Sequence, residues 1–139
     1  MNVTTRKNTK PIQDFAKHLE KSLKMGLDVA TVELQKEIKS NAPVLSGAYK
    51  ESISVKLSNT SDMFNNFSKV SSINPRVKLV APSFTNLPFS NSVFSVVNYA
   101  SIIESGSNGR SGLFVFSKTL TSFKPRFKSI IIEHLRRGH

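Results

Sequence analysis

One hydrophobic pattern fills the first third of the chain and constrains the fold more than any other feature. Between Pro11 and Ala42, apolar residues recur every three or four positions, which is the period of an α-helix. Pro11 suits a first helical turn, where its missing N–H costs no hydrogen bond, and Pro43 disfavours helical backbone at Ala42. The sequence therefore predicts one long amphipathic helix between these prolines, with Gly26 as the point at which it could bend. Its apolar positions are Ile12, Phe15, Ala16, Leu19, Leu23, Leu27, Ala30, Leu34 and Ile38.

Shorter apolar runs follow this helix and are separated by turn-rich segments. Ser46 and Gly47 predict a turn. Ile53, Val55 and Leu57 then alternate with polar residues, which is typical of a half-buried strand. Further strands are predicted over residues 76–82, 93–98 and 112–116, and loops over residues 58–75 and 83–92.

Two more helices are predicted in the second half of the chain. Tyr99 and Ile103 suit about two helical turns, which Gly106 would end as a C-cap. A last helix is predicted over residues 117–137, and Pro125 starts or kinks it. This order of elements predicts an α+β fold. A small antiparallel sheet of three to four strands would pack against the long helix, beside a short helix and a C-terminal helix.

Length and composition bound the domain organisation. The 139 residues suit one domain, predicted over residues 11–139 and preceded by a flexible basic arm at residues 1–10. The absence of cysteine excludes disulfides, zinc–thiolate sites and thiol nucleophiles. No apolar run approaches the ~18–20 residues of a membrane helix, so we expect no membrane partner. The polar first residues lack the apolar core of a signal peptide, so we expect no secretion.

A glycine-rich segment has Gly106, Gly109 and Gly112 at three-residue spacing. The dinucleotide fingerprint has a different spacing and lies between a strand and a helix. A phosphate cradle also needs the N-terminus of a helix, whereas this segment follows the C-terminal end of a predicted one. The pattern therefore favours a connector over a phosphate site.

Residues suited to catalysis are sparse. Glu104 would need a second carboxylate or a histidine to act as a general acid. Among the histidines, only His18 has an acidic residue, Asp14, at helical i, i+4 spacing, and two ligands do not make a metal site. No serine stands in a G-x-S-x-G elbow. We expect no enzyme, no metal and no cofactor, and the remaining enzyme alternative is a small hydrolase that pairs Glu104 with a histidine.

The charge balance is strongly basic, with 20 lysines and arginines against nine acids and a net charge of +11. Phe123 and Phe127 interleave with basic residues near the end of the chain, a pattern that could contact phosphates. The alternative is a solvated basic face over two core phenylalanines, since no known nucleic-acid-binding signature is present. The candidate contacts to a polyanion or a partner are Arg6, Lys7, Lys10, Arg110, Lys124, Arg126, Lys128, Arg136 and Arg137.

Two stretches together carry a family resemblance. "APVLSGAYKESI", residues 42–53, resembles the pattern A-P-x-x-[ST]-G-x-[LY]-[RK]-x-S-I. "VVNYASIIESGS", residues 96–107, resembles V-x-x-x-x-Y-A-x-[YI]-[VI]-E-x-G-[TS]. With the long helix before them, they make residues 12–137 similar to the neck, tail-completion and minor-tail-component family of tailed bacteriophages and prophages. Ser105 departs from the pattern, which usually has an aromatic residue there.

The resemblance implies a structural role in the virion rather than catalysis. It implies a ring of about six or twelve copies at the head–tail junction, around the channel through which DNA leaves. It implies a portal, connector or head-closure protein on one side of the ring and a tail terminator or tail tube protein on the other. Synthesis would be in the bacterial cytoplasm, and the DNA in the channel is a candidate partner. A basic nucleic-acid-binding accessory protein is the alternative function.

The residues of the two motifs would build a structural corner. Tyr49 and Ile53 are expected to face the core, with Tyr99 and Ile103 packed on the same sheet. Glu104, at a helix C-terminus, would need either a basic group of a neighbouring copy or the N–H groups of the following loop. The motif residues are Pro43, Ser46, Gly47, Tyr49, Ser52, Ile53, Tyr99, Ile103, Glu104 and Gly106.

Overall fold

The fold is α+β, as predicted. The computed structural model describes residues 9–43, 47–84, 87–107 and 109–137. Ser46, Arg6 and Lys7, and most of the predicted basic arm, lie outside these ranges. The elements are the helices α2 (Thr9–Asn41), α3 (Ala48–Ser52), α4 (Met63–Ile73), α5 (Ala100–Ser105) and α6 (Val115–Arg137), and the strands β1 (Ile53–Lys56), β2 (Ser92–Ser95), β3 (Gly106–Ser107) and β4 (Arg110–Ser111).

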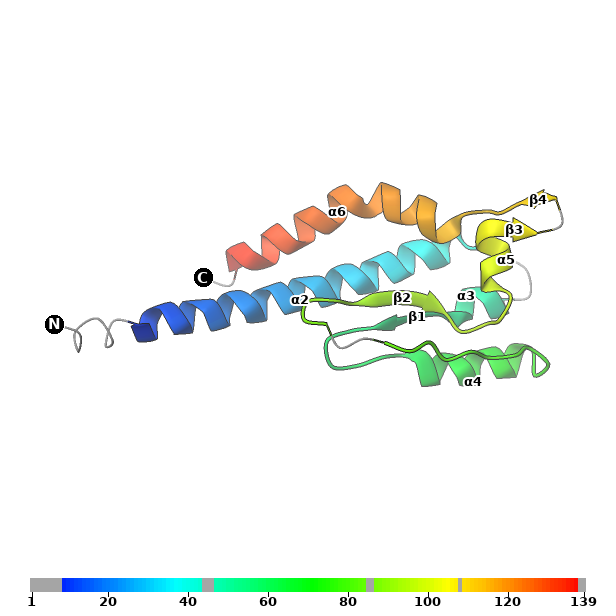
Figure 1. Ribbon diagram of the computed structural model, residues 1–139, viewed down its shortest axis with the longest axis horizontal. Helices are drawn as coiled ribbons and strands as arrows, with labels where there is room; N and C mark the ends of the chain where they lie inside the picture. The colour runs from blue at the N-terminus through cyan, green and yellow to red at the C-terminus, as the bar shows by residue number, and fades with distance from the viewer. Residues whose placement is uncertain (1–8, 44–46, 85–86, 108, 138–139) are drawn as a thin grey trace.

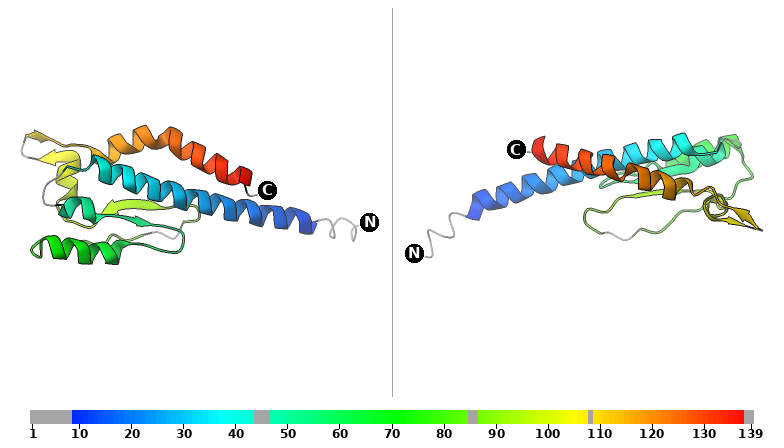
Figure 2. Two further views of the ribbon diagram at one scale, coloured as in Figure 1. Left: turned by 180° about the vertical axis from the view of Figure 1, so that it is seen from behind. Right: turned by 90° about the horizontal axis from the view of Figure 1, so that it is seen from above.

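The long helix organises the molecule, and the prediction of it is confirmed. Helix α2 has 33 residues and is therefore about 50 Å long. Helix α6 packs along one side of α2, and the sheet lies on the other side of its C-terminal half (Figure 1). Helix α4 covers the sheet from below in the same view. The N-terminal part of α2 extends beyond the end of α6, which the view from above also shows (Figure 2).

Two clusters of buried side chains hold these layers together. The larger one joins α2, α3, the sheet, α4 and the start of α6, with Tyr49 and Ile53 at its centre. A smaller one lies between the two long helices and contains Ala30, Phe123 and Ile130. The sequence left open whether Phe123 and Phe127 are core residues or part of a contact surface. Phe123 is a core residue, whereas Phe127 is 40% exposed.

The sheet has two strands, so the prediction of three to four is wrong. Strands β1 and β2 are antiparallel and pair Ile53 with Ser95 and Lys56 with Ser92. The strand predicted over residues 76–82 forms only a single bridge, between Leu79 and Val97. On the side of residue 76 the ladder cannot continue, because the segment that pairs with it turns into α5 after Asn98.

The strand predicted over residues 112–116 is also absent. Leu113 and Phe114 donate their backbone N–H groups to the carbonyls of Ile103 and Glu104, at distances of 2.8 and 3.0 Å. Phe114 has a left-handed backbone, with φ of 49°, and α6 starts at Val115. These hydrogen bonds to the end of α5 replace the sheet ladder that the apolar run suggested.

Most of the loop predicted over residues 58–75 is helix α4 (Met63–Ile73). Five of its 11 residues are serine or asparagine, and they conceal a helical spacing of Met63, Phe67 and Val70. Asn66 is buried rather than solvated, because its side-chain amide donates hydrogen bonds to the Ile53 carbonyl and the Ser54 hydroxyl. The last helix is confirmed, and Pro125 lies inside it rather than at its start.

Candidate functional site

The first motif forms the corner between α2 and the sheet. Pro43 follows the end of α2, and Gly47 has a left-handed backbone with φ of 87° before α3. Tyr49 and Ile53 are almost completely buried in the main core. The buried Ser52 hydroxyl lies 2.6 Å from the hydroxyl of Ser95 and so ties α3 to strand β2.

The second motif packs a short helix onto the same core. Tyr99 and Ile103 are partly buried against the main cluster. Gly106 ends α5 with φ of 85° and donates its backbone N–H to the carbonyl of Ile102. Burial raises the pKa of Tyr49 to about 12, and the negative charge of Glu104 adds to that increase. The two motifs, about fifty residues apart in sequence, therefore meet around one buried tyrosine.

Glu104 connects the second motif to helix α6. Its carboxylate oxygens accept hydrogen bonds from the backbone N–H groups of Phe116 (2.9 Å) and Ser117 (3.0 Å) and from the Ser117 hydroxyl (2.7 Å). The first N–H groups of a helix have no partner within the helix, and the positive end of the helix dipole favours an anion there. Burial acts to raise the pKa of Glu104, but these hydrogen bonds outweigh it and hold the pKa below its ordinary value. Two partners were expected for Glu104, a basic group of a neighbouring copy or N–H groups that follow it in the sequence. The structure has the second kind, from the first turn of α6.

The glycine-rich segment makes a tight connection between α5 and α6. Strands β3 and β4 form a small hairpin that pairs Gly106 with Ser111 and Ser107 with Arg110. A Cβ atom added at Gly112 would lie 2.1 Å from the backbone oxygen of Glu104, so a side chain has no room there. The third glycine therefore allows the chain to pass close to the end of α5.

A comparison with protein-family models finds one match, over residues 7–106, to the family described as "Bacteriophage HK97-gp10, putative tail-component". The match includes the first motif and all but the last residue of the second, and it covers well over half of the chain. The chain belongs to the HK97 gp10-like family of phage tail components. No match to a curated protein or to a solved structure accompanies it.

Two polar residues of this HK97 gp10-like chain that link α2 to the sheet, Gln35 and Asp62, were not singled out from the sequence. The Gln35 amide, on α2, donates hydrogen bonds to the Ile53 carbonyl (2.9 Å) and to a carboxylate oxygen of Asp62 (2.7 Å). The other oxygen of Asp62 accepts the Val55 N–H at 2.8 Å. The available signal was Gln35 itself, a polar residue three positions before Ile38 on the apolar face of the helix.

The basic candidate residues do not form one site. Arg126 pairs with Glu33 on α2 at 3.2 Å, and Arg137 pairs with Glu133 one turn earlier on α6. Lys10 is exposed in the first turns of α2, beyond the end of α6 (Figure 1). Arg110 lies in β4. The exposed members on α6 that have no ion pair within the described ranges are Lys124, Lys128 and Arg136.

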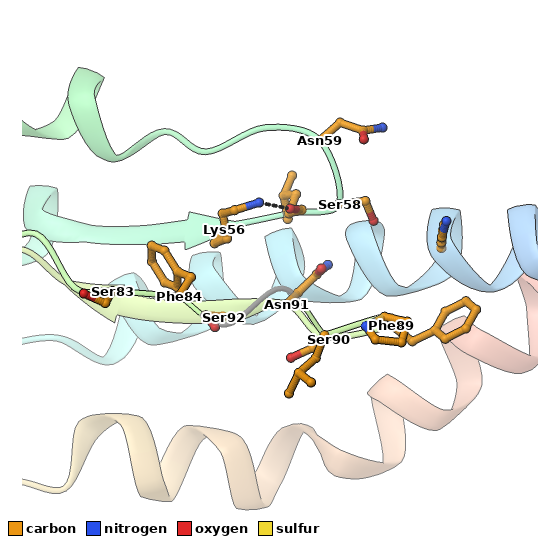
Figure 3. Close-up of a pocket in the computed structure, with 13 residues that line it drawn as sticks. Lys56, Ser58, Asn59, Ser83, Phe84, Phe89, Ser90, Asn91 and Ser92 are labelled. Atoms are coloured by element: carbon orange, nitrogen blue, oxygen red, sulfur yellow. Dashed lines mark hydrogen bonds between the residues drawn. The ribbon is translucent and has the colours of Figure 1, made fainter.

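One hollow of 530 Å³ lies between α2, the end of β1 and the segment before β2 (Figure 3). Lys24 and Lys56 line it with Phe84 and Phe89, and the Lys24 ammonium lies 5.9 Å from the Phe89 ring centre. Among the described residues that line it there is no histidine and no carboxylate. Within the described part of the chain, no group of three metal-ligating side chains is present, and no helix is long and apolar enough to cross a membrane.

Proposed function

We propose that this protein is a structural component of the virion at the head–tail junction, a neck or tail-completion protein. Its copies would form a ring of about six or twelve subunits around the DNA exit channel, joining the portal or connector to the tail. Membership of a family of phage tail components supports the virion location. The proposal goes beyond this membership in two respects. It places the protein at the head–tail junction, and it arranges the copies in a ring.

The observation that carries the structural role is the use of the motif carboxylate. Both oxygens of Glu104 accept hydrogen bonds from the first turn of α6, so this carboxylate holds the start of α6 against the end of α5. A general acid would instead need its proton near neutral pH, whereas the pKa of Glu104 is lowered. This arrangement favours a structural role of Glu104 over the hydrolase alternative.

The partners follow from the proposed position. A head-closure or portal protein would bind one side of the ring and a tail terminator or tail tube protein the other. A ring that closes through head-to-tail contacts needs two different surfaces on each subunit. No step of chemistry and no cofactor is part of this function.

A basic nucleic-acid-binding accessory protein is the second candidate. The exposed Lys124, Lys128 and Arg136 on α6 favour it, because these cations are available to phosphates. If this function is the main one, the affinity for duplex DNA falls steeply as salt increases, and replacing these three residues with glutamine reduces both the affinity and the salt slope.

Counting copies in the particle tests the proposal. Quantitative mass spectrometry of purified virions would compare this chain with the portal protein. A fixed ratio near one half or one copy per portal subunit is the expected result. Absence from the particle, or a trace that varies between preparations, would rule out the junction role and favour the DNA-binding candidate.

A further inference from the structure

A single apolar seam runs along α2, and only its second half is covered by α6. The seam consists of Ile12, Ala16, Leu19, Leu23, Gly26 and Ala30, at alternating spacings of four and three residues. This spacing places the side chains on one face of a helix and is the spacing with which two helices pack along each other. All six positions lie within the continuous helix α2.

The covered half of the seam is the contact with α6. A Cβ atom added at Gly26 would lie 3.0 Å from the Cβ of His134, which shows how closely the last turns of α6 approach. Ala30 is completely buried with Phe123 and Ile130. One turn further along α2, Glu33 pairs with Arg126.

The seam continues past the end of α6 into solvent. Residues 10–21 of α2 are all exposed, and this part of the helix lies beyond the C-terminal end of α6 (Figures 1 and 2). Ile12 is 69% exposed and Leu19 is 38% exposed. Isolated helices of this length are marginal in water, so most of the stability of such a segment has to come from packing its apolar face. The part of the helix that carries the first half of the seam, residues 10–23, is called the α2 arm below.

A receiving surface lies at the opposite end of α2. Two shallow hollows of 440 and 470 Å³ meet at the start of α6 and share Lys118 and Ser122. Leu113 and Pro43 line one hollow, and Phe114 lines the other. Leu113 is 50% exposed and Phe114 is 42% exposed. These residues are called the α6 patch below.

We infer that the α2 arm of one copy docks on the α6 patch of the next copy. The inference rests on the proposed ring, and it names the two surfaces through which that ring closes. A head-to-tail contact needs two different surfaces on one subunit, and here two apolar surfaces lie at the two ends of the same helix. The arm also extends an existing helix–helix interface, so a second copy continues the packing that α6 begins.

Two surface variants test the inference. The arm variant combines Ile12→Glu with Leu19→Glu, and the patch variant combines Leu113→Glu with Ser122→Glu. The matched control, Gln13→Glu with His18→Glu, adds the same charge to the arm at exposed positions outside the seam. Circular dichroism and thermal melting establish that each variant is folded, and Ser122→Glu alone replaces the patch variant if that one does not fold.

Native mass spectrometry and light scattering then give the oligomeric state. We expect the wild-type protein and the control to assemble, and each surface variant to associate about 100-fold more weakly or worse. A mixture of the two variants contains one intact arm and one intact patch, so we expect it to give a 1:1 dimer and no ring.

Three results would overturn the inference. An arm variant that assembles like the wild type would show that the arm is not the contact, while the ring itself would stand. A mixture that yields no mixed 1:1 dimer would contradict the pairing of arm with patch, and dimers of the patch variant alone would indicate that arms pair with arms. A wild-type protein that stays monomeric up to hundreds of micromolar would also exclude this contact, and the copy number in particles would then decide the proposed function separately.

Discussion

The carboxylate of Glu104 and the backbone N–H of Phe116 lie 2.9 Å apart, so a residue in the last turn of α5 also caps the start of α6. Two backbone hydrogen bonds join the same two elements, because the N–H groups of Leu113 and Phe114 donate to the carbonyls of Ile103 and Glu104. Helix α6 is thereby fixed to the second motif. The packing of α6 along α2 therefore depends on a connection between α5 and α6 that the Glu104 side chain completes.

Replacing Glu104 with alanine is expected to weaken this connection. Loss of a helix cap costs about 0.5–2 kcal/mol of the free energy of unfolding. Chemical denaturation followed by circular dichroism measures the change. Glu20→Ala is the control, because Glu20 forms only an exposed i, i+4 pair with Lys24, for which about 0.5 kcal/mol or less is expected. Equal effects of the two changes would contradict the capping role.

The stability is expected to depend on pH through the same group. Because the pKa of Glu104 is lower in the folded protein than its ordinary value of 4.5, the unfolded state takes up the proton first as the pH falls. The contribution is complete above the unfolded pKa and is lost as the pH decreases through the folded pKa. Denaturation midpoints between pH 6 and 2 should therefore differ between wild type and Glu104→Gln by an amount that shrinks on acidification. A difference that is constant over this range would exclude the carboxylate as its source.

The sequence predicted the helices better than the strands, and particular residues show why. The long run from Ile12 to Ile38 has one period over many turns, which no local competitor disturbs. The apolar stretch from Gly112 to Phe116 was too short to separate a strand from a helix start, and contacts with α5 decided it. Helix α4 was missed because its buried polar residue, Asn66, has partners that only the folded chain supplies.

The candidate site was predictable to the same limited extent. The two motifs were visible as patterns, and the burial of Tyr49 and Ile53 agrees with the expected core positions. The partner of Glu104 was left open between two alternatives, because it depends on where α6 starts. The role of Asp62 could not be read from the sequence at all, since Gln35 lies 27 residues away on another helix.

Gly112→Ala is expected to destabilise the protein severely. The added Cβ would lie 2.1 Å from the Glu104 carbonyl oxygen, so either α5 or the start of α6 has to move. We expect a loss of more than about 3 kcal/mol, or failure to fold. Gly109→Ala is the matched control: its left-handed backbone, with φ of 79°, costs about 1–2 kcal/mol, but no described atom lies within 4 Å of the added Cβ. If thermal melting places both variants at the same temperature, the close approach at Gly112 is not what limits stability.

The contact between Gln35 and Asp62 is expected to be strongly coupled. Gln35→Leu removes the donor of two hydrogen bonds: one Asp62 oxygen loses this donor, and the Ile53 carbonyl keeps the bond from the Asn66 amide, at a cost of about 1–3 kcal/mol. Asp62→Ala removes the acceptor of the Val55 N–H as well. Because both changes act on one network, the double variant should lose less stability than the sum of the single variants, by about 0.5–3 kcal/mol. Strictly additive losses in a double-mutant cycle would mean that the hydrogen bond between Gln35 and Asp62 adds nothing to stability.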